Sequence, residues 1–318
     1  MLETIILKNR PNLAQSSVKT YMCSLRRIMK DTGIELKSPE DFIKNVDIIL
    51  EKAMKYTPIV RKSRLASILV LLDDKEDIDD KGDYGNKDKN DTIKRIRVVM
   101  MKDAKTVDEE ETKQELTEKQ KENFLPQDEI INIYEVLKEQ ATPLFKLNQL
   151  NKKQFETMQL YVLLSLYVLI PPRRTMDYTH FKIRNINPEV HNFFLAPKKK
   201  KELGSFVFNQ YKNSNKLGAQ VIERIPKELE KIIEKWKQFN KSDYLLVNNV
   251  GKQVAGSRIA VMLNDLFGKK ISTSMLRHIY LTNKFGNINL KDLKDTAQEM
   301  GSSGLERMLK YVDKNDDA

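Results

Sequence analysis

The chain has 318 residues and a formal net charge of +11, so a polyanion such as nucleic acid is the first class of partner to consider. Its single cysteine, Cys23, excludes an internal disulfide, favours a reducing intracellular compartment and is expected to be a small core residue. The longest apolar run, Met158 to Ile170, is too short for a membrane span and predicts a buried helix. Scattered histidines and the lack of a glycine-rich phosphate loop indicate neither a metal nor a nucleotide, and we expect no cofactor.

Residues 1–122 predict a helical domain. Apolar residues recur at helical spacing over 16–32, 39–55 and 61–72, with Ser16 or Ser17 and Ser38 as candidate caps and Gly33 as a stop. Basic residues on these helices are usually solvated, but in a DNA-binding domain they can lie on phosphates. The candidates for such contacts are Lys19, Arg61, Lys62 and Arg64.

An acidic segment interrupts this domain. From Asp73 to Asp91 there are nine Asp or Glu and four Lys, a local net charge of −5, so the rest of the chain carries +16. Residues 73–92 show no apolar period and predict a mobile loop. The apolar pattern resumes at Ile93. The charged stretch 102–122 predicts a solvated helix or linker. We therefore place the domain boundary near Asn123, with the second domain at 123–318.

The second domain predicts helices around a small antiparallel sheet. A buried helix at 155–170 is stopped by Pro171 and Pro172. Strands are expected at 205–211 and 219–225, because the polar, Gly-containing segment between them is typical of a hairpin loop. After Pro226 the apolar residues return to helical spacing. The fold class is therefore mainly α, with a helical first domain and a mixed α+β second domain.

Four positions of the second domain suit one chemistry. Arg174 follows the buried helix, Lys212 opens the hairpin loop, and Arg277 and Tyr311 come later in the chain. Arginine presents a fixed fork of donors to phosphate oxygens, and tyrosine can hold a cut DNA strand covalently. Each residue alone has an ordinary alternative, such as a surface ion pair or simple packing. Their order and neighbours predict attack of a tyrosine on a DNA phosphodiester.

The blocks around these positions resemble the catalytic domain of tyrosine recombinases. Arg174 is followed three residues later by Asp177, and Leu276-Arg277-His278 matches the block of the second family arginine. Met300-Gly301-Ser302 followed by Tyr311 matches the end of the family domain. The resemblance implies Arg174, Lys212, Arg277 and Tyr311 as catalytic residues, with Ser274, His278 and Ser302 supporting them and Arg173 as a neighbouring phosphate or DNA contact.

The N-terminal half more weakly resembles the core-binding domain of these enzymes, through Ser17-Val18-Lys19-Thr20-Tyr21 and Leu25. In the second domain, the blocks Pro171-Pro172-Arg173-Arg174 and Tyr211-Lys212-Asn213-Ser214 resemble those of integrases of large DNA viruses and their mobile elements. The resemblance implies a site-specific recombinase or integrase that forms a 3′-phosphotyrosine bond with double-stranded DNA. It also implies a dimer or tetramer on DNA, away from membranes, in the cytoplasm or, for a eukaryotic virus, in the nucleus or viral replication compartment.

Two positions depart from the family pattern. Ser274 and Ser302 stand where the family has histidines, and serine offers a hydrogen bond but no useful base near neutral pH. Loss of general base catalysis typically costs roughly 10²–10⁴-fold. Two alternatives therefore stay open: a DNA-binding relative with weakened catalysis, and a topoisomerase of the same chemistry.

Overall fold

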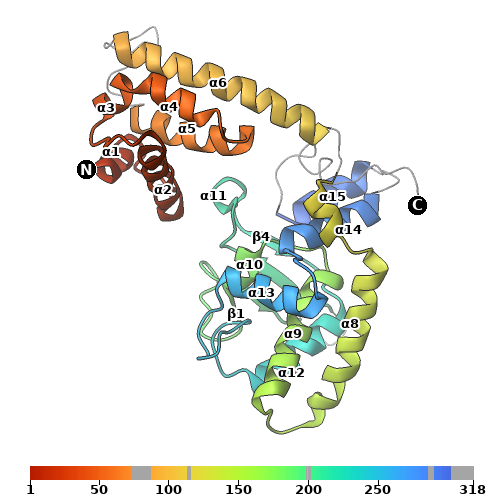
Figure 1. Ribbon diagram of the computed structural model, residues 1–318. Coiled ribbons are helices and arrows are strands. Elements are labelled where there is room, and N and C mark those ends of the chain that lie inside the picture. The colour runs from red at the N-terminus through yellow and green to blue at the C-terminus, as the bar shows by residue number, and fades with distance from the viewer. Residues whose placement is uncertain (73–86, 113–115, 198, 200–201, 286–289, 302–318) are drawn as a thin grey trace. The chain divides into compact units, whose positions relative to one another are not determined.

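The computed structural model describes residues 1–72, 87–112, 116–197, 199, 202–285 and 290–301, and for 109, 111, 112 and 290–294 it describes the backbone only. The chain divides into two compact units, Met1–Lys113 and Gln114–Ala318 (Figure 1). The division falls somewhat before the boundary expected near Asn123. The helix that contains Asn123 belongs to the second unit, where the Asn123 side chain accepts a hydrogen bond from the Lys270 backbone amide.

The first unit is helical throughout its described residues. Helix α5 packs against α1, α2 and α6, and the buried apolar faces form one core that includes Leu25, Phe42 and Leu65. The helices are α1 (Leu2–Asn9), α2 (Gln15–Thr32), α3 (Pro39–Lys44), α4 (Val46–Ala53), α5 (Pro58–Leu72) and α6 (Lys87–Thr112).

The helix caps and stops predicted for the first unit are confirmed in part. Gly33 ends α2 in the left-handed conformation, and Ser38 and Asp41 form a capping box at the start of α3. Helix α2 begins one residue earlier than expected, with Ala14 at its N-cap, so the prediction of Ser16 or Ser17 as the cap is wrong. The expected helix 39–55 is divided at Asn45, whose side chain donates to the Asp41 carbonyl.

Two further expectations need correction. Cys23 lies on the exposed side of α2 and is not a core residue. The acidic loop expected over 73–92 is shorter at its C-terminal end, because residues 87–92 form the first turns of α6. The remainder of that segment, 73–86, lies outside the described residues.

The second unit surrounds a four-stranded sheet with helices. The strands are β1 (Phe181–Lys182), β2 (Asn192–Leu195), β3 (Ser205–Phe208) and β4 (Gln220–Ile222), in the order β1-β2-β3-β4. The β2–β3 and β3–β4 pairs are antiparallel, whereas β1 and β2 are parallel. The sheet is therefore mixed, and the expectation of an antiparallel sheet holds for three of the four strands.

The helices of the second unit bury the apolar stripes that the sequence predicts. Helices α8 and α9 lie side by side (Figure 1), and Trp236 on α12 is fully buried beside Phe155. The elements are α7 (Glu118–Asn123), α8 (Gln127–Ala141), the 3₁₀ helix η2 (Thr142–Lys146), α9 (Lys152–Val168), α10 (Thr175–Thr179), α11 (Ser214–Leu217), α12 (Lys227–Phe239), α13 (Gly256–Phe267), α14 (Thr273–Phe285) and α15 (Leu290–Glu299). Within the described ranges, no helix is both long enough and apolar enough to span a bilayer.

Candidate active site

The two predicted catalytic arginines lie at the starts of two helices that are tied together. Arg174 is the N-cap of α10, directly after the proline pair that follows α9. Arg277 lies on the first turns of α14 and is buried. The hydroxyls of Thr175 and Thr273 are 2.6 Å apart and join the beginnings of these helices. The structure thus brings together two arginines that are distant in the sequence.

The positive charges of these two arginines both act on one carboxylate, that of Asp177. Asp177 is 1% exposed, and burial raises its pKa. The positive charges of Arg173, Arg174 and Arg277 act in the opposite direction and lower that pKa, in decreasing order. Three guanidinium charges near enough to act on a single carboxylate leave an excess of positive charge, which suits an anion such as a phosphodiester.

Arg173 differs from its neighbour Arg174 because it is fully buried. Its Nε donates to Asp177 Oδ2 at 2.8 Å, its Nη1 to the Glu299 carbonyl, and its Nη2 to Gln220 Oε1 at 3.0 Å. A guanidinium enclosed in this way has no face left for a DNA phosphate. The expectation that Arg173 contacts DNA or replaces Arg174 on the phosphate does not fit this geometry.

The end of α15 reaches the arginines. The carbonyl of Gly301 accepts hydrogen bonds from Arg174 Nη1 at 3.0 Å and from Asn213 Nδ2 at 3.4 Å. Met300 is buried against Leu281 and Phe285 of α14. The motif Met300-Gly301 therefore contacts the segment of Arg174, whereas Ser302 and Tyr311 lie outside the described residues.

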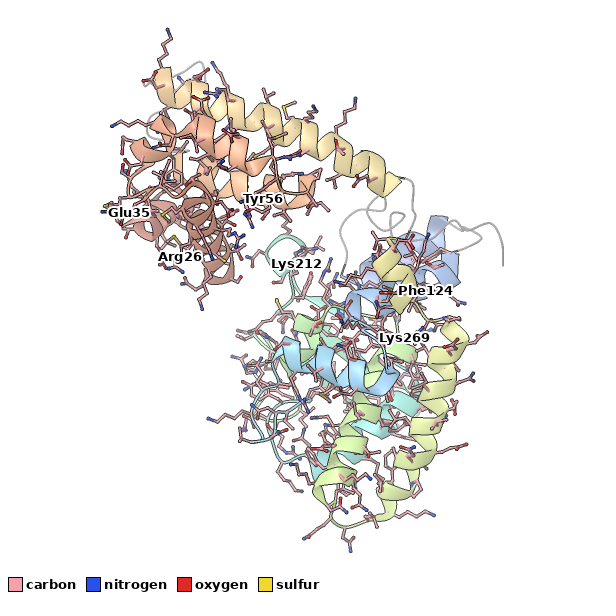
Figure 2. The ribbon with its side chains drawn as sticks, viewed as in Figure 1. Arg26, Glu35, Tyr56, Phe124, Lys212 and Lys269 are labelled. Atoms are coloured by element: carbon pink, nitrogen blue, oxygen red, sulfur yellow. The ribbon has the colours of Figure 1, made fainter. Side chains whose placement is uncertain are left out.

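Lys212 is exposed on the loop between β3 and β4 (Figure 2). Both strands are shorter than expected, and the loop contains the short helix α11. The Tyr211 hydroxyl donates to the Gly218 carbonyl at 2.8 Å and closes the loop at its base. Asn192 is fully buried on β2, and its side-chain oxygen accepts the amides of Asn209 and Gln210. Lys212 is therefore presented by a hairpin whose base is fixed.

Helix α14 also carries the supporting residues Ser274 and His278. Ser274 is exposed in the first turn of α14, three residues before the buried Arg277. His278 is largely buried, and burial together with the charge of Arg277 lowers its pKa to about 4. Its imidazole is therefore neutral at physiological pH, so it can exchange hydrogen bonds but adds no positive charge.

The DNA-contact candidates of the first unit fall into two groups. Lys19 on α2 and Lys62 on α5 are exposed and available to a phosphate backbone. Arg61 is 9% exposed, is paired with Asp103 and donates to the carbonyls of Met54 and Tyr56. The expectation of a DNA contact at Arg61 does not fit this burial, because a buried ion pair that loses one partner costs about 3–5 kcal/mol.

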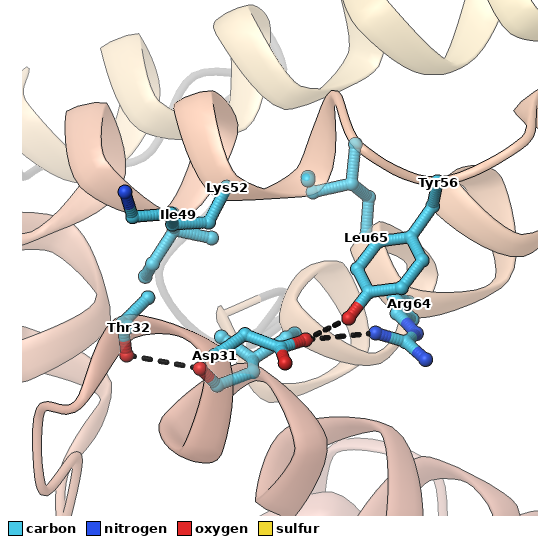
Figure 3. A pocket seen from close by; sticks show the side chains of 9 residues that line it. Asp31, Thr32, Ile49, Lys52, Tyr56, Arg64 and Leu65 are labelled. Atoms are coloured by element: carbon cyan, nitrogen blue, oxygen red, sulfur yellow. Dashed lines mark hydrogen bonds and ion pairs between the residues drawn. The ribbon is translucent and has the colours of Figure 1, made fainter.

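Arg64 belongs to a cluster around Asp31, shown in Figure 3. Its guanidinium lies 3.5 Å from the centre of the Tyr56 ring, and its Nη1 is 3.0 Å from Asp31 Oδ2. Burial raises the pKa of Asp31, but hydrogen bonds from Tyr56 and Lys55 and the charge of Arg27 lower it to about 2. The adjoining cavity of about 10 Å³ has room for no more than one water. This cluster joins α2, α4 and α5 rather than forming a ligand pocket.

Several residues that organise the site were not predicted from the sequence. Gln220, Asn192 and Asn213 are uncharged and lie in or beside short strands, where a polar side chain usually faces solvent. The one available signal was position, since Gln220 and Asn213 lie on the hairpin already expected to carry Lys212. Their hydrogen bonds depend on segments far away in the chain, which no local pattern reports.

The chain matches known proteins in its fold but not in its sequence. No protein-family model matches the chain, and no curated protein matches it. Among solved structures, the XerH site-specific recombinase bound to palindromic difH substrate, a post-cleavage complex, aligns with a TM-score of 0.58 at 13% identity, covering 94% of this chain and 77% of XerH. The fold is that of the tyrosine recombinases.

A lambda integrase dimer bound to a COC′ core site gives the same result for the tyrosine recombinase fold. Its TM-score is 0.54 at 11% identity, and the match covers 99% of this chain and 94% of the integrase. Such low identity transfers the architecture and not the individual residues. The roles of Arg174, Lys212 and Arg277 must therefore be argued from the site of this chain.

Proposed function

We propose that the chain is a site-specific DNA recombinase or integrase that cleaves and rejoins strands through a 3′-phosphotyrosine intermediate. The observation that carries the proposal is the placement of Arg174 and Arg277 at the joined beginnings of α10 and α14, with Arg174 bonded to the Gly301 carbonyl, in a tyrosine recombinase fold. A scissile phosphate would displace Gly301 from Arg174 and take both guanidinium groups. Arginine binds phosphate oxygens in a fixed, charged geometry, which makes it suitable for this role.

The proposed reaction assigns one task to each group. The Tyr311 oxygen attacks the phosphorus and forms a new P–O bond, its proton goes to solvent, and the bond to the 5′ oxygen breaks. Lys212 gives a proton to the leaving 5′ oxygen. Arg174 and Arg277 stabilise the extra negative charge of the transition state, which is usually the largest contribution to such catalysis. The phosphotyrosine bond keeps the energy of the broken bond, so rejoining requires no further energy source.

The first unit would bind the same DNA through charge. Lys19 and Arg26 are exposed on α2, where Figure 2 labels Arg26, and Lys62 is exposed on α5. These side chains suit contacts with the phosphate backbone, which position a protein on DNA without reading its sequence. The neighbour structures that contain DNA are dimers or tetramers in some cases, and we propose that this chain likewise acts as an assembly on DNA.

The serines at positions 274 and 302 favour a second candidate function, DNA binding with weakened cleavage. With Ser274 and Ser302 in place of histidines and a neutral His278, the site lacks an evident strong base. A DNA-binding protein of the same fold with weakened cleavage would have the same structure as an active recombinase in every described residue. Chemistry, rather than binding, must distinguish the two functions.

The test is covalent capture. The full chain is incubated with a pool of nicked duplexes of random sequence, and protein–DNA adducts that survive denaturation are isolated and sequenced. We expect adducts from the wild type and none from Tyr311→Phe, which removes only the hydroxyl and keeps DNA affinity. Binding without any adduct from the wild type would favour the non-catalytic function. An adduct from Tyr311→Phe would place the nucleophile elsewhere.

A further inference from the structure

Arg173 is the least expected member of the site, because it is a fully buried charged side chain in contact with several segments of the chain. Beyond its bond to Asp177, its guanidinium lies 3.9 Å from the centre of the Phe208 ring and 5.5 Å from that of Tyr211. Burying an arginine is costly unless its donors and its charge are satisfied. Around Arg173, hydrogen-bond acceptors and a carboxylate from separate elements satisfy its donors and its charge.

These contacts lie on both sides of the hairpin that carries Lys212. Phe208 ends β3, Tyr211 immediately precedes Lys212, and Gln220 begins β4. Gln220 receives a hydrogen bond from Arg173 Nη2 and passes one from its own Nε2 to the Gln298 carbonyl at 3.2 Å. The base of the loop is therefore held by Arg173 from both strands.

The same guanidinium holds the end of α15. Its Nη1 donates to the Glu299 carbonyl, two residues before the Gly301 carbonyl that contacts Arg174. A carbonyl at a helix C-terminus carries partial negative charge, which favours a cation there. Arg173 thus connects three parts of the site: the segment of Arg174, the hairpin of Lys212, and α15, which precedes Tyr311 in the sequence.

We propose that Arg173 is a positioning residue that fixes the hairpin so that Lys212 reaches the leaving oxygen. The inference rests on the proposed cleavage reaction and adds a residue to it. Lysine cannot replace arginine in this role, because its ammonium group lacks the planar fork that serves Asp177, Gln220 and Glu299 at once. A misplaced Lys212 would slow proton transfer to the leaving group, a contribution of roughly 10²–10⁴-fold in general acid catalysis.

The test compares two leaving groups in the DNA sequence recovered by covalent capture. One substrate has the natural 5′ oxygen at the cleavage point, and the other has a bridging 5′ sulfur. A thiol is far more acidic than an alcohol, with a pKa of about 8.5, so the thiolate leaves without a proton. We expect Lys212→Ala, Arg173→Lys and Gln220→Leu to slow cleavage of the oxygen substrate by on the order of 10²-fold, and to cleave the sulfur substrate within a few-fold of the wild type.

Arg184→Lys is the matched control. Arg184 also donates to several backbone carbonyls, those of Lys237, Asn240 and Ser242 at the end of α12, and it has no contact with the hairpin among the described residues. Its replacement should change cleavage of the two substrates by the same factor. Gln220→Leu keeps Arg173 in place and serves if Arg173→Lys fails to fold, which fluorescence of the buried Trp236 reports.

The outcomes separate the inference from the function on which it rests. Rescue of Arg173→Lys or Gln220→Leu by sulfur, as for Lys212→Ala, supports a positioning role. Equal slowing of both substrates, with rescue of Lys212→Ala alone, would mean that Arg173 merely stabilises the fold and would overturn the inference. Wild-type rates in both variants would overturn it as well. Failure of the wild type to form any adduct in the covalent capture would instead overturn the proposed function.

Discussion

Gly301 combines an unusual backbone conformation with close surroundings in the candidate site. Its φ is +63°, a conformation that costs a residue with a side chain about 1–2 kcal/mol. A Cβ at this position would lie 2.8 Å from Arg173 Nη2 and 3.0 Å from Gln220 Oε1. Since both atoms belong to the network around the hairpin, a methyl group here would also break hydrogen bonds.

We therefore predict that Gly301→Ala destabilises the second unit by about 2–4 kcal/mol, the backbone cost plus that of one disrupted buried hydrogen bond. Urea unfolding followed by Trp236 fluorescence measures the effect, and amide hydrogen exchange over residues 290–301 reports release of α15. Gly268→Ala is the control, because Gly268 has φ +64° and open space around its would-be Cβ. Equal losses in the two variants would show that the contacts with Arg173 and Gln220 contribute nothing.

His278 makes the second unit sensitive to acid. Its pKa is about 4 in the folded protein, where burial and Arg277 disfavour the charged form, and its ordinary value is 6.5. Above pH 6.5 the imidazole is neutral in both folded and unfolded chains. As the pH falls from 6.5 to 4, the unfolded chain binds a proton that the folded chain refuses, so stability is lost over that window.

Replacing the imidazole should remove this part of the acid sensitivity. We predict that the free energy of unfolding of His278→Asn, relative to the wild type, rises by on the order of 2–3 kcal/mol between pH 7 and pH 4. Urea titrations at several pH values, read from Trp236, give the comparison. His191→Asn should change the pH dependence much less, because His191 lies nearer the surface. An unchanged slope in His278→Asn would contradict the assigned burial of the charge.

At the scale of elements, local chemistry predicted the helices that it controls. Ser38 caps α3 and the helix starts at Pro39 as expected, and Gly33 ends α2, because caps and stops act within a few residues. The division of residues 39–55 at Asn45 was missed, since no proline or glycine marks it. Both strands were predicted too long. Residues 209–211 leave β3 and join the hairpin loop held by Asn192, and residues 223–225 lie beyond the end of β4.

Part of the candidate site was predictable because it, too, is marked by local sequence signals. Arg174, Lys212 and Arg277 stand in recognisable blocks, and their residue types fit phosphate chemistry. The opposite environments of Arg173 and Arg174 were not predictable, because the two are adjacent and identical in chemistry. Only the packing of Phe208, Gln220 and the end of α15 makes one arginine internal and leaves the other at the surface of the site. That packing joins segments distant in the sequence, which no local pattern specifies.

At the scale of the whole molecule, charge is distributed unevenly. The chain carries +11 overall, yet residues 74–86 contain six Asp or Glu and two Lys, a local −4. Negative charge tethered to a basic protein lowers the potential that attracts DNA, whatever its position, and the effect declines with distance over a Debye length of about 10 Å at 0.1 M salt. The acidic segment should therefore oppose non-specific binding.

We predict that replacing the six acidic residues of this segment by Asn and Gln tightens non-specific DNA binding several-fold at 50 mM salt, because the net charge rises by six at unchanged chain length. Titration of a labelled random duplex measures the affinity, and raising the salt to 0.5 M should remove most of the difference by screening. Replacing Lys75 and Lys81 by Gln is the control of opposite sign and should weaken binding. If both sets of substitutions shift the affinity in the same direction, the segment acts through the conformation of the chain rather than through its charge.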